Sequence, residues 1–360
     1  MAMFCLWDMR TVLRLGAPST VTLGMYFLAI ETSCDETAAA VFTEERAILS
    51  NVVASQTDLH ARFGGVVPEV AARAHLQRLL PVIDEALKRA GIRLDQVGCI
   101  AVHNKPGLVG ALLVGVSAAK MLSLGLDVPL IAVNHIASHI YACRLAAEKD
   151  IFPCIGLVIS GGHTALFHCR GALDFELIGA TLDDAAGEAF DKVAALLGLG
   201  FPGGPAVEKE AASGDPRAFA FPRSFIHEDR LDFSFSGLKT AVRYALGGPN
   251  AAHPAPPGPG KLRSDLAGSF QQAVIDVLVG KSRQALEQTG LGRLAVGGGV
   301  AANRTLRSAF EKMVQEVQAE LFIPPMALCT DNAAMAALAV EKWAAGEFAA
   351  MDVDAVASLT

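Results

Sequence analysis

Two segments of the chain repeat one pattern, and this repetition restricts the possible folds more than any other feature. The first segment runs from Tyr26 to Phe42 and the second from Cys154 to Phe167. Each consists of an apolar run, a short polar turn and a second apolar run, which is the pattern of a β-hairpin. Helical stretches follow both hairpins. The repetition therefore predicts two α/β units built on one plan, each of which begins with a hairpin.

The residues after each hairpin alternate between strand and helix patterns. The expected helices are 75–90, 110–124, 135–147, 183–197 and 262–288, and the expected strands are 97–102, 130–133 and 294–296. The helix at 110–124 is rich in glycine and alanine and is predicted to be buried. This order predicts an α/β protein of two RNase H-like subdomains, the arrangement of actin- and hexokinase-type ATPases. In those proteins a nucleotide lies in the cleft between the halves.

The boundaries of the two subdomains follow from the same pattern. The first is predicted to comprise residues 25–137 together with 320–348, and the second to comprise residues 138–319. Residues 1–24 are interpreted as an extension outside the fold, because their apolar stretch is interrupted by Gly16-Ala17-Pro18 and no clear cleavage site follows it. Residues 249–260, which are rich in proline and glycine, are predicted to form a surface loop.

Composition agrees with two packed units and argues against several classes of function. The 360 residues are 52% hydrophobic, which is sufficient for two cores. The net charge of −7 does not favour binding of nucleic acid by bulk charge, so an RNA contact needs a local patch or a partner. The seven cysteines form no CxxC pair, which argues against a disulfide framework and favours a reducing cytoplasm. No segment is predicted to cross a membrane.

Two histidines four residues apart, His135 and His139, form the first candidate for a chemical site. Residues at this spacing lie on one face of a helix, so both imidazoles can reach one ion, and Asn134 is a suitable N-cap. Two ordinary histidines explain the pair equally well. Ile136 stands where the HExxH motif of zinc proteases has its glutamate, so the general base of that motif is missing.

Asp331 offers a third ligand for the same ion. An aspartate at the start of a helix is also a common N-cap, and for this segment alone the cap is the stronger explanation. Two histidines and one carboxylate would leave coordination positions open for substrate oxygens. Such a donor set suits iron(II) or zinc acting as a Lewis acid.

Two glycine-rich turns and an acidic turn complete the candidate site. The segments Val158–Gly162 and Gly297–Asn303 each follow a strand, and glycines there let a phosphate or a nucleoside approach the backbone, although hairpin turns and helix starts also use glycine. Asp35 and Glu36 lie in the turn of the first hairpin and could bind a cation or accept a proton. Asp191 is a candidate to bind sugar hydroxyls.

Taken together, these motifs resemble the universal tRNA threonylcarbamoyladenosine transferases, a family formerly named O-sialoglycoprotein endopeptidases. The resemblance runs from about Tyr26 to about Ala345. Besides the segments above, Gly298-Gly-Val-Ala-Ala-Asn303 among them, it rests on five further motifs: Ala54-Ser-Gln56, Gly64-Gly-Val-Val-Pro-Glu69, Ala72-Arg-Ala-His75, Phe201-Pro-Gly-Gly-Pro205 and Phe233-Ser-Phe-Ser-Gly-Leu-Lys-Thr240. One departure lies near the predicted cleft, where Lys105 replaces the first glycine of the family's Gly-Pro-Gly.

The resemblance implies an activity and a role for each matching residue. The family transfers a threonylcarbamoyl group from threonylcarbamoyl-AMP to the exocyclic amine of the adenosine 3′ of the anticodon, position 37, in tRNAs that read codons starting with adenine. The metal ligands would be His135, His139 and Asp331, with iron(II) favoured over zinc. The acidic residues of the phosphate-region turn would be Asp35 and Glu36. Substrate contacts would come from Val158, Ile159, Ser160, Gly161, Gly162, Asp191, Gly204, Glu208 and Asn303.

The resemblance also implies partners, and the fold leaves rival activities open. The expected partners are tRNA, a paralogous partner subunit and a small ATPase, with a separate synthase that makes the adenylate. A metal-dependent peptidase and a small-molecule kinase on the same fold are the alternative enzymes, and a non-catalytic scaffold is the third alternative. The missing HExxH glutamate argues against the peptidase.

Overall fold

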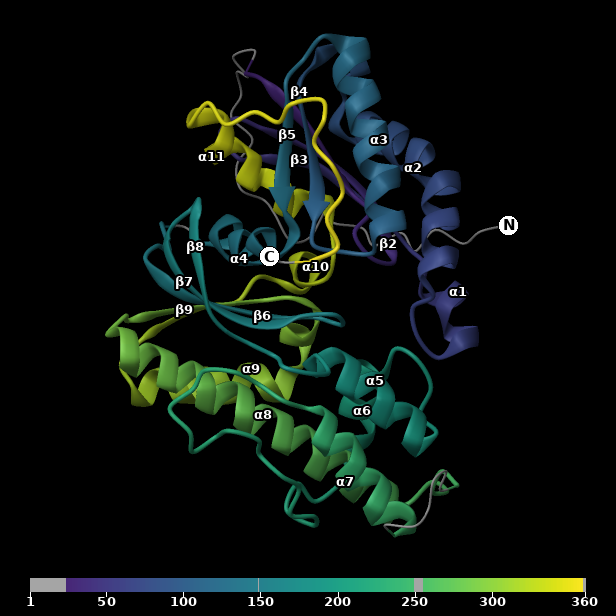
Figure 1. Ribbon diagram of the computed structural model, residues 1–360, viewed down its shortest axis with the longest axis vertical. Helices are drawn as coiled ribbons and strands as arrows, with labels where there is room; N and C mark the ends of the chain where they lie inside the picture. Colours follow the sequence, from purple (N-terminus) through teal and green to yellow (C-terminus); the bar gives the residue numbers. More distant parts are fainter. Residues whose placement is uncertain (1–23, 148, 249–254, 359–360) are drawn as a thin grey trace.

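The first of two sheets forms the upper half of the molecule in Figure 1. The computed structural model describes residues 24–147, 149–248 and 255–358. The strands of this sheet are β1 (Tyr26–Glu31), β2 (Glu36–Thr43), β3 (Ile48–Ser55), β4 (Val97–Lys105) and β5 (Leu130–Asn134). Their order is β3-β2-β1-β4-β5. Strands β1, β2 and β3 pair antiparallel, whereas β4 and β5 run parallel to β1.

The second sheet repeats this topology. Its strands are β6 (Cys154–Ile159), β7 (Thr164–Gly171), β8 (Asp174–Ala180), β9 (Arg293–Gly297) and β10 (Glu320–Phe322). Their order is β10-β9-β6-β7-β8. Read from the β8 end, this is the order of the first sheet, with β6 and β7 in the places of β1 and β2. The pairing again begins antiparallel, and β9 again runs parallel to the first strand of the hairpin. The predicted duplicated α/β fold is therefore confirmed.

Helices cover both faces of the first sheet. One face packs against α2 (Pro68–Ala90) and α3 (Val109–Leu126) through residues such as Leu79, Ile83 and Val116. The other face packs against α4 (His135–Ala146), a 3₁₀ helix at Ala333–Ala337 and α11 (Leu338–Ala344). Helix α4 also contacts β6 and β9, so it lies between the two sheets, as Figure 1 shows. The short helix α1 (Thr57–His60) precedes α2.

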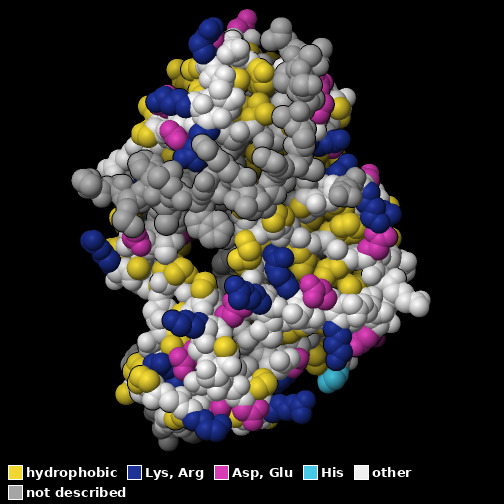
Figure 2. All heavy atoms as spheres, turned by 180° about the vertical axis from the view of Figure 1, so that it is seen from behind, with side chains coloured by type: hydrophobic (Ala, Val, Ile, Leu, Met, Phe, Trp, Pro, Cys, Tyr) yellow, Lys and Arg dark blue, Asp and Glu magenta, His cyan; other side chains and the backbone are white. Residues whose placement is uncertain are grey.

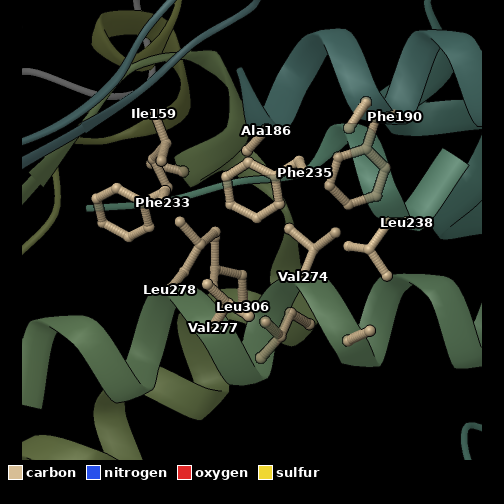
Figure 3. Packing of buried hydrophobic residues seen from close by; sticks show 14 of the residues in the cluster. Ile159, Ala186, Phe190, Phe233, Phe235, Leu238, Val274, Val277, Leu278 and Leu306 are labelled. Carbon is tan, nitrogen blue, oxygen red and sulfur yellow. The ribbon is translucent and has the colours of Figure 1, made fainter. Parts of the chain in front are cut away.

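The second sheet packs its outer face on a layer of longer helices. These are α5 (Ala186–Leu197), α6 (Gly203–Ala211), α7 (Ser236–Gly247), α8 (Lys261–Thr289) and α9 (Arg304–Glu316), and the short α10 (Met326–Cys329) follows β10. In Figure 3 the rings of Phe190, Phe233 and Phe235 lie above Val274 of α8. Phe233 and Phe235 are fully buried, so the motif that contains them builds the core of this half.

Two details of the predicted helices are wrong for physical reasons. The predicted helix at 183–197 begins at Ala186, because the Asp183 carboxylate accepts hydrogen bonds from Ser234 and Ser236 and holds the preceding chain against α7. Helix α3 is buried on one side only. The side chains of Met121 and Leu124 are 68% and 60% exposed.

The small residues of α3 serve close packing on the first sheet. A Cβ atom at Gly115 would lie 2.4 Å from Thr32 Oγ1, so only glycine fits there. Among the described residues, α3 is the one helix long and apolar enough to cross a membrane by length and composition. Its buried face packs against β4 and α2. The prediction that no segment crosses a membrane stays a prediction.

The predicted subdomain boundaries meet one difficulty at residue 320. Strand β10 begins there and pairs with β9, so it belongs to the second sheet although 320–348 is predicted to belong to the first subdomain. The division otherwise stays a prediction. The interpretation of residues 1–24 falls outside the described residues except for Gly24, and so does that of 249–254 in the predicted surface loop, while residues 255–260 hold no helix or strand.

Candidate metal and nucleotide site

His135 and His139 lie on the first turns of α4, where the two halves of the molecule meet. The Asn134 side chain accepts hydrogen bonds from the backbone N–H groups of Ile136 and Ala137, so the predicted N-cap is confirmed. The two imidazole rings are 4.7 Å apart between centroids. Both side chains are buried, so this pair is not a surface feature.

Asp331 reaches the same two rings from the C-terminal part of the chain. Its Oδ1 lies 3.1 Å from His139 Nε2 and 3.6 Å from His135 Nε2. The alternative interpretation of Asp331 as a helix cap is wrong, because the neighbouring Asn332 caps the 3₁₀ helix by accepting a hydrogen bond from Met335 N–H. The carboxylate of Asp331 is therefore left to face the histidines.

These three side chains fit a divalent cation. Their ligand atoms all lie within 4.8 Å of one another. Both ring nitrogens of His139 are buried and have no hydrogen-bond partner, and the 3.1 Å approach to Asp331 lacks the alignment of a hydrogen bond. Buried polar atoms without partners are rare, and two imidazoles with one carboxylate are a donor set for iron(II) or zinc. The described residues therefore contain a group that could hold a metal.

The protonation of the two histidines differs. Burial lowers the pKa of His139, which favours the neutral form that binds metals. Burial also opposes protonation of His135, but the carboxylates of Asp331 and Glu31 outweigh it and raise its pKa to about 9. A cation at this site would replace that proton, because imidazole must be neutral to act as a ligand.

Two residues beside His135 were not assigned a role from the sequence. Glu31 Oε2 lies 3.0 Å from His135 Nδ1 and 2.8 Å from His103 Nδ1, and all three side chains are buried. They stand at the ends of the parallel neighbours β1, β4 and β5. The sequence offered one signal for them, their places at the carboxyl ends of predicted strands. Side chains at the carboxyl ends of adjacent parallel strands meet at the same edge of a sheet.

Asp35 lies in the turn of the first hairpin, as predicted, and Glu36 follows it as the first residue of β2. Burial and the charges of Asp35 and Asp331 raise the pKa of Glu36 well above its ordinary value. Its Oε1 accepts a hydrogen bond from Ser55 Oγ at 3.2 Å. A carboxylate whose pKa is raised is a stronger base than an ordinary one, which suits Glu36 to accept a proton beside the candidate metal group.

The glycine turn of the second hairpin lies close to the same histidines. Burial, His135 and His139 lower the pKa of His163 to about 4, so this side chain is neutral. Ser160 N–H donates to the carbonyl of His163, which closes the turn. A Cβ atom added to Gly161 or Gly162 would meet nothing within 4 Å. These glycines are therefore not required by packing, and they leave open space above the backbone.

Val158 and Ile159 differ from the other predicted substrate contacts. Both are strand residues of β6 with fully buried side chains that belong to the hydrophobic cores. Only their backbone groups could take part in binding. Ser160 is the first residue of the segment that leaves the strand, and its Oγ accepts a hydrogen bond from His163 N–H.

The remaining predicted contacts gather at the starts of α6 and α9. Asp191 accepts a hydrogen bond of 2.7 Å from Gly203 N–H, and burial together with Asp35 and Glu188 raises its pKa to about 6. Gly204 faces open space. Glu208 accepts a hydrogen bond from Arg304 N–H, which places it beside Asn303 at the N-terminus of α9. Asn303 Oδ1 caps α9 through Leu306 N–H.

Comparison with known proteins identifies this combination of features. A sequence model described as "TsaD: tRNA N6-adenosine threonylcarbamoyltransferase" matches residues 47–338. The chain belongs to this family. The family member of Rhodopirellula baltica is 52% identical over 339 residues, which cover 91% of this chain and 95% of that protein. The member of Bacillus subtilis is 52% identical over 316 residues, which cover 88% and 89%. As a threonylcarbamoyltransferase family member, this chain is a transferase.

Solved structures support the fold. The nucleotide-bound form of full-length HypF superimposes with a TM-score of 0.58 at 14% identity, covering 90% of this chain and 56% of HypF. Component A of the Acidaminococcus fermentans (R)-2-hydroxyglutaryl-CoA dehydratase gives a TM-score of 0.53 at 15% identity, covering 89% and 99%. At these identities the similarity shows the shared two-subdomain fold.

Proposed function

We propose that this chain transfers the threonylcarbamoyl group of threonylcarbamoyl-AMP to N6 of the adenosine 3′ of the anticodon, position 37, in tRNAs reading codons that start with adenine. The observation that carries this assignment is the group of His135, His139 and Asp331 beside a glycine turn that is open to a ligand. The family membership supports the reaction, and the chemistry of the neighbouring side chains and turns supports a role for each in holding the substrate.

The reaction forms one bond and breaks another at a single carbonyl. The adenosine amine attacks the carbamoyl carbon, a C–N bond forms, the C–O bond to phosphate breaks, and AMP leaves. The proposed ligands are His135, His139 and Asp331, and iron(II) or zinc bound to them would supply a Lewis acid for the carbonyl or hold the threonyl carboxylate. The adenine must leave its stack to reach this buried group.

The acidic turn of the first hairpin supplies the proton acceptor. The attacking amine loses one proton, and a base accepts it best when its pKa lies near the working pH. Burial and neighbouring carboxylates raise the pKa of Glu36 well above that of an ordinary carboxyl group, so its carboxylate is the stronger base. We therefore assign Glu36 as the residue that accepts the proton of the attacking amine. The charge of Asp35 contributes to the raised pKa of Glu36.

The second subdomain supplies the contacts to the adenylate. The backbone N–H groups of Gly161 and Gly162 would stabilise the charge on the leaving phosphate, beside the hydroxyl of Ser160, whose own N–H closes the turn. The carboxylate of Asp191 suits the ribose hydroxyls. Gly204, Glu208 and Asn303 border the open space at the starts of α6 and α9, where the nucleoside would pack.

Reconstitution tests the function directly. The full chain would be incubated with unmodified tRNA, threonine, bicarbonate, ATP, the synthase and the partner proteins, and the tRNA would be digested for nucleoside mass spectrometry. The expected result is threonylcarbamoyladenosine at position 37. Release of amino acids from a peptide substrate would support the peptidase instead, and ATP consumption with phosphorylation of a small acceptor would support the kinase.

The glycines of the second hairpin provide a test of the nucleotide site. Gly162→Val is expected to weaken binding of adenine nucleotides by roughly tenfold or more, because the side chain enters space that the ligand needs. Thermal unfolding of this variant should change little. The matched change Gly187→Ala should instead destabilise the fold, since its Cβ would lie 2.5 Å from the Ser160 carbonyl oxygen. Equal nucleotide affinity in Gly162→Val and the unaltered protein would contradict the proposed site.

The outer sides of α2 and α3 support the proposal of a paralogous partner subunit. Leu76 and Leu80 of α2 are each 69% exposed, although the sequence pattern counted them among the apolar residues of the helix. Met121 and Leu124 of α3 are also exposed. Helices α2 and α3 lie side by side in Figure 1 and pack against each other. An apolar surface on neighbouring helices is typical of a protein interface.

A charge on this surface tests the partner assignment. The double variant Leu80→Glu with Leu124→Glu is expected to lower affinity for the paralogous subunit at least 100-fold, because two carboxylates would be buried without partners. Titration calorimetry with that subunit gives the affinity. Leu262→Glu, at an exposed leucine of α8, is the matched control. An unchanged affinity in the double variant would show that the paralogous subunit does not bind at this surface of α2 and α3.

The surface charge bears on how tRNA is held. On the face shown in Figure 2, Lys and Arg side chains lie beside Asp and Glu side chains. Ion pairs such as Arg223 with Asp276 neutralise part of the basic charge. We therefore propose that tRNA is bound together with the partner subunit and the small ATPase, in the cytoplasm, and not by this chain's bulk charge.

A further inference from the structure

A buried cluster lies on the side of His135 that faces away from Asp331. The Glu31 carboxylate, at the end of β1, accepts a hydrogen bond of 3.0 Å from His135 Nδ1. His103, at the end of β4, brings its Nδ1 within 2.8 Å of the same Glu31 oxygen, and its Nε2 lies 3.0 Å from Ser138 Oγ. The side chains of Glu31 and His103 are fully buried.

This contact fixes which nitrogen of His135 is free. Because a carboxylate can only accept, His135 Nδ1 carries a hydrogen, so Nε2 is the nitrogen that loses its proton when the ring binds a cation. That Nε2 is the atom 3.6 Å from Asp331. Ser33 Oγ lies 3.0 Å from His135 Nδ1 and restrains the ring further. The imidazole is held in the orientation and tautomer that a ligand at Nε2 requires.

We propose that Glu31 and His103 are positioning residues that hold His135 ready to bind the cation. This inference rests on the metal ligands proposed above. Hydrogen bonds from a metal-bound histidine to a carboxylate orient the ring and raise its basicity. His103 acts one step further out. It lies against Glu31 and makes an edge contact with the His135 ring, with 5.7 Å between centroids.

A second cation between Glu31, His103 and His135 is the competing explanation, since these ligand atoms also lie within 4.8 Å of one another. His135 Nδ1 donates a hydrogen bond of 3.0 Å to Glu31 Oε2, whereas His103 Nδ1 lies 2.8 Å from the same oxygen without the alignment of a hydrogen bond. The other Glu31 oxygen already accepts a hydrogen bond from Ser33 N–H. Each oxygen of the buried Glu31 carboxylate therefore already accepts a hydrogen bond. This favours a role in positioning His135 over a role as ligand of a second cation.

The zinc affinity of the metal-free full chain, measured by competition with a chelator, tests the inference. Glu31→Gln is the sharpest variant because it keeps the volume of the side chain. The amide of the glutamine has one oxygen and one NH₂ group. In either orientation the NH₂ group faces a hydrogen-bond donor, Ser33 N–H or the histidines, so one of the present hydrogen bonds is lost. Its zinc affinity is expected to fall about 10- to 100-fold. Glu31→Asp, which keeps the carboxylate, should recover part of this loss.

Two further variants separate positioning from general stability. Thr32→Val removes a neighbouring buried hydrogen bond, from Thr32 Oγ1 to the Ala111 carbonyl, on the side away from the histidines. It is expected to lower the unfolding temperature without changing zinc affinity. His103→Leu should lower zinc affinity less than Glu31→Gln, because His135 keeps its bond to Glu31. It also tests the inference if Glu31→Gln does not fold.

The outcomes distinguish this inference from the metal assignment itself. If His135→Ala loses zinc while Glu31→Gln and His103→Leu bind it as tightly as the unaltered chain, the positioning role is overturned and the metal ligands stand. Zinc binding that survives in both His135→Ala and Asp331→Ala overturns the metal ligands. Two zinc ions per chain, with one lost in His103→Leu, would establish the second cation site. NMR of ¹⁵N-labelled histidine should show hydrogen on His135 Nδ1 in the zinc form, and hydrogen on Nε2 would contradict the proposal.

Discussion

Replacing His135 with alanine is expected to abolish metal binding and to reduce threonylcarbamoyl transfer by at least about a thousandfold. The variant leaves His139 and Asp331 as two ligands, and two ligands seldom hold a divalent ion against water. Asp331→Ala should have the same effect, because it removes the one carboxylate within reach of both Nε2 atoms among the described residues. Elemental analysis of the purified protein and mass spectrometry of tRNA nucleosides measure the two effects.

An exposed histidine provides the control for this prediction. His227 lies on the surface of the second subdomain, and among the described residues it belongs to neither group that could hold a metal. His227→Ala should retain both metal and transfer. Full transfer by a metal-free His135→Ala protein would show that the cation is not needed, and the same analysis of the unaltered protein distinguishes iron from zinc.

The fold could be predicted from the sequence because its main signals are local. The apolar periodicity of Tyr26–Phe42 and Cys154–Phe167 was sufficient to identify both hairpins, and each pairs as expected. The start of α5 could not be predicted. It depends on hydrogen bonds between Asp183 and Ser234, which are 51 residues apart in the chain. The exposure of Leu76 and Leu80 likewise depends on how α2 packs against α3, which a helical period does not reveal.

The site could be predicted only in part for the same reason. His135 and His139 are four residues apart on one helix, so their proximity is a local property. Asp331 joins them only through the fold, and the sequence alone favoured a cap for it. Glu31 and His103 were missed as a pair because 72 residues separate them, and only the parallel pairing of β1 with β4 brings them together.

Asp191→Asn is expected to stabilise the folded protein at high pH while weakening substrate binding. The folded-state pKa of Asp191, about 6, lies above its ordinary value of 3.8, so the folded protein binds this proton more tightly than the unfolded chain. The stability that the protonated group contributes is present below about pH 4 and is lost as the pH rises through about 6. Asparagine never acquires the charge, and its amide oxygen can still accept the hydrogen bond from Gly203 N–H.

The metal-free protein and the variant would be compared by urea unfolding at pH 8 and pH 4. A shift of about two pKa units corresponds to roughly 2 to 3 kcal/mol, so Asp191→Asn should be more stable by about 2 kcal/mol at pH 8 and equally stable at pH 4. Its affinity for adenylate should fall roughly 10- to 100-fold, since a hydrogen bond to a charged group contributes about 1.5 to 3 kcal/mol. A stability gain without loss of affinity would remove Asp191 from the substrate contacts. Equal stability at pH 8 would show that Asp191 is ionised at no cost in the folded state. A gain in stability together with a loss of adenylate affinity is expected for a residue that serves binding at a cost to the stability of the fold.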